Sequence, residues 1–259
     1  MTDAPRELPA DLEAALERAA GADRLLVASD FDGTLAPFVL DPMEARALAG
    51  TLDDLIALAG MERTDAAIVS GRDLEVLKDL TNFSGDFVTL IGSHGGESSR
   101  SGAASMVDRQ TLAHLVAEIE QSVIDQAPQV RLEYKPSSIV LHTRGLPDQD
   151  VDAAHAIAHR AAERDGVRLL RGKSVVELTV ATADKGTAIR ALADEVGASM
   201  VVYLGDDVTD EHAFAALGEE DLGIKVGEGS TAAAYRVQTC EDVASVLRTL
   251  REVREQQTR

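Results

Sequence analysis

The chain has 259 residues, of which 45% are hydrophobic, a single cysteine and a formal net charge of −20 at pH 7. This composition is that of a globular protein of one or two domains, and one cysteine excludes an intramolecular disulfide and any zinc or iron–sulfur site built from several cysteines. The acidic balance disfavours nucleic acids and anionic membranes as partners, and no apolar run approaches the about 20 residues that a membrane span needs.

Short apolar runs rich in β-branched residues alternate with segments of helical periodicity along the chain. Strands are predicted over residues 25–29, 66–70, 87–91, 130–134, 139–143, 167–170, 174–180, 200–204 and 223–226. Helices are predicted over residues 10–20, 45–58, 73–80, 108–125, 149–164, 185–196, 209–217 and 242–249.

The order of these elements predicts an α/β fold with an insertion. Residues 25–95 alternate strands and helices, and their wholly apolar strands are typical of a buried parallel sheet. Within 104–182, two strands are separated only by residues 135–138, which predicts an antiparallel hairpin. We therefore expect a doubly wound, Rossmann-like core of residues 1–103 and 183–259, split by an α+β domain of residues 104–182, with residues 98–105 as a linker.

Two carboxylates follow the first predicted strand of the core. Asp30 and Asp32 alternate along an extended chain, so both side chains can project past the strand end, and Gly33 permits a sharp turn before Thr34. Ligands bind at the carboxyl ends of parallel strands. The alternative interpretation is an ordinary turn with solvated acids, since Asp and Gly are common in turns.

A second acidic cluster follows the strand at 200–204. It contains Asp206, Asp207 and Asp210, and part of it is explained by capping of the next helix, for which Asp207 and Thr209 are suitable. Capping does not explain why two strands of one sheet both end in carboxylates. Because crowded carboxylates are costly without a cation, the pattern predicts a hard divalent ion such as Mg²⁺.

Two further loops lead to the same edge of the sheet. Ser70, Gly71 and Arg72 open a predicted helix, where a hydroxyl and exposed amides can hold an anion, although Ser70 could simply be a helix cap. Lys185 opens another helix, and a lysine at a helix N-terminus is disfavoured by the helix dipole. Its position therefore predicts a specific anionic partner.

In this order, the four segments resemble the signature motifs of the haloacid dehalogenase-like (HAD) phosphatases over about residues 25–250. The matches are DxDGT, a Ser after the second strand, a Lys at a helix start and a GDxxxD-type acidic cluster. The segments DFDGTLAP, SGR, GSHG and YLGDDVTDEHAF are similar to those of the trehalose-6-phosphate phosphatase family. The inserted domain is similar to that family's substrate-specificity cap in its Glu-x-Lys, His-x-Arg and Gly-Lys…Glu elements, but Leu178, Thr179 and Val180 stand where the family often has Ile-Arg-Pro.

The resemblance implies an Mg²⁺-dependent phosphatase that forms an aspartyl-phosphate. It implies Asp30 as nucleophile, Asp32 as acid and base, and Ser70 and Lys185 on the phosphoryl oxygens. It implies Mg²⁺ ligands from Asp30, the main-chain carbonyl of Asp32 and Asp206, with Asp207 and Asp210 as further ligands or as residues that orient the ligands. The substrate-binding residues that it implies are Gly33, Thr34, Gly71, Arg72, His94, Gly95, Glu133, Lys135, Arg144, Lys173 and Glu177.

Several alternatives remain open at this point. The Glu and Lys residues of the inserted sheet are equally typical of a solvated sheet face, and a lone His such as His94 is more often structural. The substrate could be another glycosyl phosphate, such as sucrose phosphate or a glycosyl-phosphoglycerate, and a mutase would share the Asp pair. A non-catalytic, phosphorylation-dependent receiver module places its acidic pair before the acceptor Asp, whereas here the cluster at Asp206 comes last. A catalytically dead sensor could have lost either Asp30 or Asp32, and both are present.

The expected surroundings of the protein follow from the same features. The N-terminal segment has no signal-peptide pattern and the lone Cys240 fits a reducing compartment, so we expect a cytoplasmic protein. The expected partner is a small-molecule sugar phosphate, with no nucleic acid and no membrane. A monomer is favoured over an oligomer, although the sequence does not itself set the oligomeric state.

Overall fold

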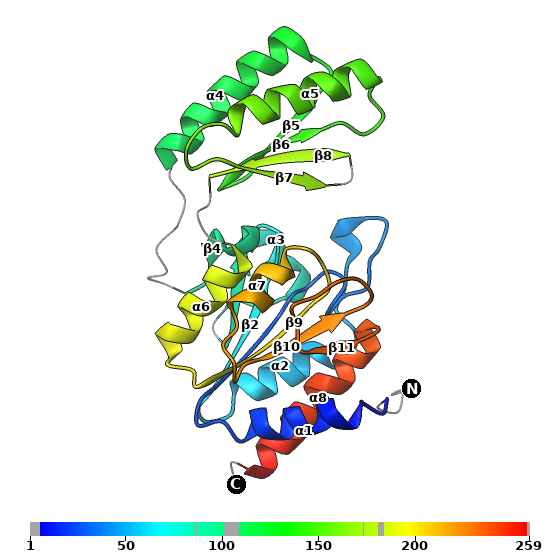
Figure 1. The fold of residues 1–259 in the computed structure, drawn as a ribbon, viewed down its shortest axis with the longest axis vertical. Helices are drawn as coiled ribbons and strands as arrows, with labels where there is room; N and C mark the ends of the chain where they lie inside the picture. The colour runs from blue at the N-terminus through cyan, green and yellow to red at the C-terminus, as the bar shows by residue number, and fades with distance from the viewer. Residues whose placement is uncertain (1–5, 86, 101–108, 173, 181–183, 258–259) are drawn as a thin grey trace. The chain divides into compact units, whose positions relative to one another are not determined.

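The protein divides into two compact units, one of Met1–Ala103 with Ala183–Arg259 and the other of Ala104–Thr182. The computed structural model describes residues 6–85, 87–100, 109–172, 174–180 and 184–257. In those parts of the chain, no helix has the length and apolar character that crossing a bilayer requires. Figure 1 shows the two units, each of which is described separately below.

The first unit contains a seven-stranded sheet with the order β11-β10-β9-β1-β2-β3-β4. All neighbouring strands are parallel except β3 and β4, so the predicted doubly wound parallel sheet is confirmed. Its strands are β1 (Leu25–Ser29), β2 (Thr64–Val69), β3 (Val88–Gly92), β4 (Glu97–Ser98), β9 (Met200–Gly205), β10 (Leu222–Val226) and β11 (Tyr235–Val237). The edge strands β4 and β11 were not predicted, because two and three residues are too few to show a period.

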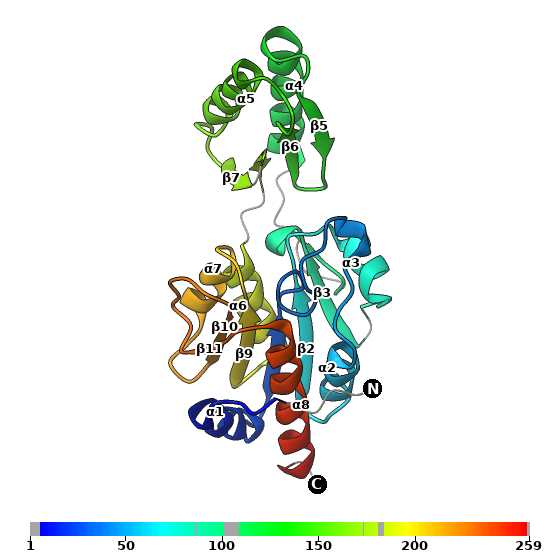
Figure 2. The same cartoon turned by 90° about the vertical axis from the view of Figure 1, so that its right-hand side faces the viewer.

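Helices cover both faces of this sheet, so its central strands are buried on both sides. In β1, Leu25 and Val27 pack into one apolar cluster and Leu26 and Ala28 into another. The first cluster includes residues of α1 (Ala10–Ala20), α2 (Thr51–Ala59), α3 (Leu74–Thr81) and α8 (Cys240–Gln257), and the second residues of α6 (Lys185–Val196) and α7 (Asp210–Ala216). Figure 2 shows α6 and α8 on opposite sides of the sheet.

The predicted start of the second helix at residue 45 is wrong. The helix begins at Thr51, directly after Gly50, whose φ of 90° lies in the left-handed region and interrupts any helix that runs through it. Upstream, a short 3-10 helix covers Pro42–Glu44, and the amide of Leu48 donates to the carbonyl of Leu35 at 2.8 Å. The chain before α2 therefore runs back along the loop that follows β1 instead of forming another helical turn.

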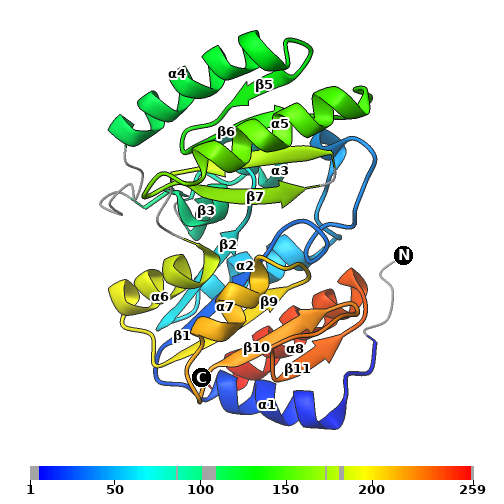
Figure 3. The same cartoon turned by 45° about the horizontal axis from the view of Figure 1, so that its top comes forward.

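The second unit is a two-layer α/β arrangement (Figure 3). Its antiparallel sheet has the order β5-β6-β8-β7, and the predicted hairpin is confirmed as β5 (Arg131–Tyr134) paired with β6 (Ser138–His142). The remaining strands are β7 (Arg168–Gly172) and β8 (Val175–Thr179). The helices α4 (Arg109–Gln126) and α5 (Asp148–Ala161) pack against one face through a cluster that includes Ile119, Ile139, Ile157 and Leu178. The other face carries polar side chains and is described with the site.

Candidate active site

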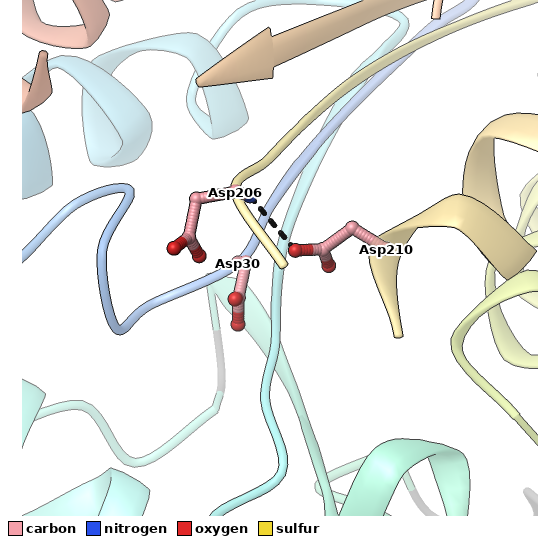
Figure 4. Close-up of side chains that lie close together, drawn as sticks. All are labelled: Asp30, Asp206 and Asp210. Atoms are coloured by element: carbon pink, nitrogen blue, oxygen red, sulfur yellow. Dashed lines mark hydrogen bonds between the residues drawn. The ribbon is translucent and has the colours of Figure 1, made fainter. Parts of the chain in front are cut away.

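The carboxyl ends of three neighbouring strands, β9, β1 and β2, place the main predicted motifs together. Asp30 follows β1, Asp206 follows β9 and Ser70 follows β2. One carboxylate oxygen each of Asp30, Asp206 and Asp210 lie within 4.8 Å of one another. Figure 4 shows that the three side chains converge from the ends of β1 and β9 and from the start of α7. The sheet thus assembles an acidic group from segments far apart in the sequence.

Lys185 lies between two of these carboxylates. Its Nζ is 3.0 Å from Oδ1 of Asp30 and 2.7 Å from Oδ1 of Asp210, and the three side chains are at most 6% exposed. Burial acts to lower the pKa of Lys185, but the nearby carboxylates outweigh it and raise this pKa above its usual value, so the side chain stays an ammonium. The anionic partner that was predicted from its place at the start of α6 is therefore confirmed.

Asp30 is nearly buried, and its environment is unusual for a carboxylate. Its Oδ1 accepts a hydrogen bond from the amide of Phe31 at 2.7 Å in addition to the Lys185 contact. Burial raises the pKa of Asp30 well above the usual value, and Lys185 offsets only part of this effect, while Asp210 and Asp207 add to the increase. An added cation at this place would lower that pKa and favour the ionised form of Asp30.

Asp210 binds the backbone of the loop that carries Asp206 and Asp207. Its Oδ1 accepts from the Tyr203 hydroxyl at 2.6 Å as well as from Lys185, and its Oδ2 accepts from the amides of Asp206 at 2.8 Å and Asp207 at 2.9 Å. A side chain at Gly205 would overlap this carboxylate, which explains the glycine before the motif. Four donors thus occupy Asp210, so its contacts suit orienting the loop more than binding an ion.

Tyr203 was not singled out in the sequence. It lies fully buried in the apolar strand β9, and burial raises the pKa of its hydroxyl well above the usual value, so this group remains a donor. The only available signal was a phenol within an apolar run, because a buried tyrosine hydroxyl almost always has a partner.

We expect Tyr203→Phe to destabilise the protein by about 1.5–3 kcal/mol, because it removes a buried hydrogen bond to a charged acceptor. Equilibrium unfolding in urea measures this loss. The matched control is Tyr235→Phe, which removes a phenol oxygen whose contact with Arg18 is long, at 3.5 Å, and exposed, and which should change stability by less than about 0.5 kcal/mol. Equal stability of the two variants would contradict the role given to Tyr203.

Asp206 has the features of a cation ligand. Its Oδ1 atom is buried, and no donor among the described residues reaches it. Burial, with Asp210 and Asp207 nearby, raises the pKa of Asp206 to about 7. Gly33, with φ of 78°, lies so close that any side chain there would overlap the Asp206 carboxylate. An orphan oxygen beside two other carboxylates fits a hard divalent cation such as Mg²⁺, held by Asp206 and Asp30.

Asp207 points away from this group toward its own helix. Its Oδ1 accepts from the amide and the hydroxyl of Thr209, both at 2.7 Å, and from the amide of Asp210 at 3.2 Å. These contacts satisfy donors at the start of α7, as a capping side chain does. The alternative interpretation of Asp207 as a helix cap describes its contacts in this structure.

Asp32 forms a two-pronged ion pair with Arg72. Nε of Arg72 donates to Oδ2 and Nη2 to Oδ1, both at 2.6 Å. The Arg72 guanidinium also lies 5.8 Å from the centre of the Phe31 ring, within the range of a cation–π contact. The two residues are thereby locked together next to the acidic group.

The loop after β2 and the loop after β3 lie against each other. Ser70 is buried, and its carbonyl accepts from the amide of His94 at 2.9 Å. A side chain at Gly71 would overlap the His94 imidazole, and one at Gly95 would lie 2.8 Å from the Asp184 carbonyl. Thr34 is fully buried, and among the described residues its hydroxyl has no hydrogen-bond partner. The structure therefore brings these predicted residues close to the same strand ends.

The polar face of the second unit holds several of the other predicted residues. Oε2 of Glu133 lies 2.6 Å from Nε2 of His142. Nζ of Lys135 lies 3.4 Å from Oε2 of Glu177, whose Oε1 accepts from Ser138 at 2.6 Å. Arg144 lines a pocket of about 440 Å³ within this unit. Lys173, also predicted to bind substrate, lies outside the described residues.

Comparisons with known proteins give matches over most of the chain. A family model described as trehalose-phosphatase matches residues 28–245. A trehalose-phosphate phosphatase of Mycobacterium marinum is 34% identical over 257 residues, covering 92% of this chain and 64% of the relative. An uncharacterised glycosyl hydrolase of Mycobacterium tuberculosis is 33% identical, covering 86% of this chain but only 18% of the relative, so the chain spans part of the length of these relatives. The crystal structure of a trehalose-6-phosphate phosphatase related protein matches with a TM-score of 0.68 and 31% identity, covering 89% of this chain and 99% of that one.

Proposed function

The chain belongs to the trehalose-phosphatase family, and from that premise we propose that it hydrolyses trehalose 6-phosphate to trehalose and inorganic phosphate. The observation that carries this proposal is the buried Asp30, held 3.0 Å from the Lys185 ammonium and beside the carboxylates of Asp206 and Asp210. A carboxylate that is buried next to an ammonium group is not an ordinary solvated acid, and it is well placed to act as a nucleophile toward a phosphate ester.

The reaction proceeds in two in-line transfers of the phosphoryl group. A carboxylate oxygen of Asp30 attacks phosphorus, the bond from phosphorus to the sugar oxygen breaks, and Asp32, which enters this step protonated, gives that oxygen its proton. In the second step Asp32 removes a proton from a water molecule, which attacks phosphorus and releases Asp30. Asp30 cannot serve as the base because it is then bonded to phosphorus, so two separate carboxylates are needed.

Charge on the transferring group is stabilised by residues around Asp30. Lys185 and the Ser70 hydroxyl bind the phosphoryl oxygens, and Lys185 also holds Asp30 in place. We assign Mg²⁺ to Asp30, Asp206 and the main-chain carbonyl of Asp32, because Asp206 has an orphan oxygen and both carboxyls have raised pKa values. When bound, the ion supplies positive charge that reduces repulsion between Asp30 and the phosphate dianion.

Removing the divalent cation should stop the reaction. We expect EDTA to lower turnover by about 100-fold or more, since a bound cation supplies several kcal/mol of charge stabilisation, and added Mg²⁺ to restore it. Mg²⁺ should also raise the melting temperature of the EDTA-treated protein, because it binds the folded state. Full activity after exhaustive chelation would contradict the assignment of a metal.

The second unit is proposed as a substrate-specificity cap that recognises the sugar. A sugar presents hydroxyl groups, which call for polar partners such as the Glu133, Lys135 and Glu177 side chains on one sheet face. Its position in the sequence, inserted between two halves of the catalytic unit, is consistent with this role.

Lys135→Ala should therefore lower turnover of sugar phosphates by about tenfold or more while affecting a small aryl phosphate much less, because only the sugar needs this partner. The matched control is Arg171→Ala, which removes a cation from the opposite face of the same sheet, where Arg171 contacts His159 of α5. Equal losses on both substrates would remove Lys135 from sugar recognition.

A second candidate substrate class is another glycosyl phosphate. The observation that favours it is the sequence Leu178, Thr179 and Val180, which departs from the pattern that the family often shows at the end of β8. Phosphate release from trehalose 6-phosphate, sucrose 6-phosphate and glucose 6-phosphate separates the candidates. We expect the highest kcat/KM for trehalose 6-phosphate, and a clear preference for another of the three would overturn the proposed substrate.

A further inference from the structure

The guanidinium of Arg72 binds the Asp32 carboxylate, a contact that the sequence did not predict. The sequence pattern assigned Arg72 to the substrate, yet both of its hydrogen-bonding contacts go to Asp32, through Nε and Nη2 at 2.6 Å. The Arg72 side chain is 13% exposed and the Asp32 side chain 29% exposed, and the Phe31 ring lies on one side of the guanidinium. We propose that Arg72 is a positioning residue that fixes the Asp32 carboxylate for proton transfer to the leaving sugar oxygen and from the attacking water.

The backbone that carries Arg72 is held from behind by the loop after β3. The Arg72 carbonyl accepts from the amide of Ser93 at 2.8 Å, and the amide of Leu74 donates to Oε2 of Glu97 at 3.1 Å. The same Glu97 oxygen accepts from the Ser93 hydroxyl at 2.7 Å. A side chain at Gly92 would lie 2.6 Å from the Leu74 amide, so the two loops pack backbone against backbone. Arg72 therefore projects from a rigid support.

The geometry of the pair suits orientation. A planar guanidinium that donates two parallel hydrogen bonds fixes the plane of a carboxylate, which a lysine or an amide cannot do. Each carboxylate oxygen keeps a second lone pair, on which Asp32 can carry the proton that it gives to the leaving oxygen while Arg72 holds it. Because proton transfer depends on sub-ångström placement, loss of this restraint should slow the step in which the leaving group needs a proton.

This inference rests on the proposed function, in which Asp32 protonates the leaving sugar oxygen. The test compares two esters with Arg72→Ala. Trehalose 6-phosphate has a poor leaving group that needs a proton, whereas 4-nitrophenyl phosphate releases a stable anion that does not. We expect kcat/KM, which reports only the transfer to Asp30, to fall about 100-fold for the sugar ester and less than about fivefold for the aryl ester.

Further variants separate positioning from a general loss of structure. Arg72→Lys should not restore turnover of the sugar ester, because a lysine cannot donate two parallel hydrogen bonds to Asp32. Added methylguanidinium should partly restore turnover by Arg72→Ala. The control is Arg251→Ala, which removes another Arg–Asp pair, with Nε 2.6 Å from Asp54, far along α8. That control should leave the ratio of the two rates unchanged.

The outcomes distinguish this inference from the function on which it rests. Equal losses of kcat/KM on both esters, together with weaker inhibition by inorganic phosphate, would show that Arg72 binds the phosphoryl group and would overturn the inference. Absence of trehalose 6-phosphate turnover in the unsubstituted protein would instead contradict the proposed substrate. In that case the ratio is measured with whichever sugar phosphate from the panel is hydrolysed.

Discussion

Asp30→Asn should abolish turnover, with kcat falling by at least about 10⁴-fold, while the protein stays folded. An amide nitrogen and oxygen cannot displace an alkoxide from phosphorus, and removal of a covalent nucleophile in other hydrolases costs losses of this size or larger. The substitution is nearly isosteric, and the carboxamide oxygen can still accept from the Phe31 amide and from Lys185. Activity is measured as phosphate release, and folding by circular dichroism and urea unfolding.

The matched control for this substitution is Asp221→Asn. Asp221 is also a nearly buried carboxylate, with 8% of its side chain exposed, and it accepts from Arg190 and from the amides of Val201 and Gly218. It lies at the start of β10, away from the carboxyl ends of the strands. Asp221→Asn should cost stability but leave turnover within about twofold. Near-normal turnover of Asp30→Asn would refute the nucleophile assignment.

Lys185→Met should damage both catalysis and stability. Removing the ammonium leaves the Asp30 and Asp210 carboxylates buried without their counter-ion, and breaking a buried ion pair in this way costs about 3–5 kcal/mol. Turnover should fall by about 10³-fold, because Lys185 is also assigned to the phosphoryl oxygens, where the loss of a single donor already costs a factor of about 10²–10³. Urea unfolding and phosphate release measure the two losses.

A double substitution separates the two effects of Lys185. Lys185→Met combined with Asp210→Asn removes one of the two stranded charges, so it should recover part of the lost stability. It should not recover turnover, because the cation that stabilises the transferring group is still missing. A double variant that regained activity together with stability would show that Lys185 acts only as a structural counter-ion.

The placement of the motifs that contain Asp30, Ser70 and Asp206 could be predicted because the strands before them are short, apolar and buried. In such a sheet the end of each strand is set by the end of the apolar run, so Asp30, Ser70 and Asp206 were correctly expected at one edge. The anionic partner of Lys185 was also predictable, since a lysine at a helix start is unfavourable without one.

Other features could not be predicted because they depend on contacts between distant segments. Nothing local in the sequence shows that Arg72 turns to Asp32, 40 residues away, or that Glu97 reaches the amide of Leu74. The prediction of a helix from residue 45 was wrong for a different reason. The apolar periodicity of the sequence continues upstream of Gly50, but the left-handed backbone at Gly50 interrupts the helix. The hydrogen bond from Tyr203 to Asp210 could not be predicted either, because Tyr203 lies within an otherwise apolar strand.

The central claim is that Asp30 carries the phosphoryl group during turnover, and reductive trapping tests it most directly. The protein is mixed with substrate and Mg²⁺, quenched within one turnover and treated with borohydride, which reduces an acyl phosphate to an alcohol. Peptide mass spectrometry then locates the reduced residue. We predict conversion of Asp30 to homoserine, dependent on substrate and absent without it. Trapping on another residue, or none at Asp30 under conditions where trehalose is released in a burst ahead of phosphate, would contradict the account.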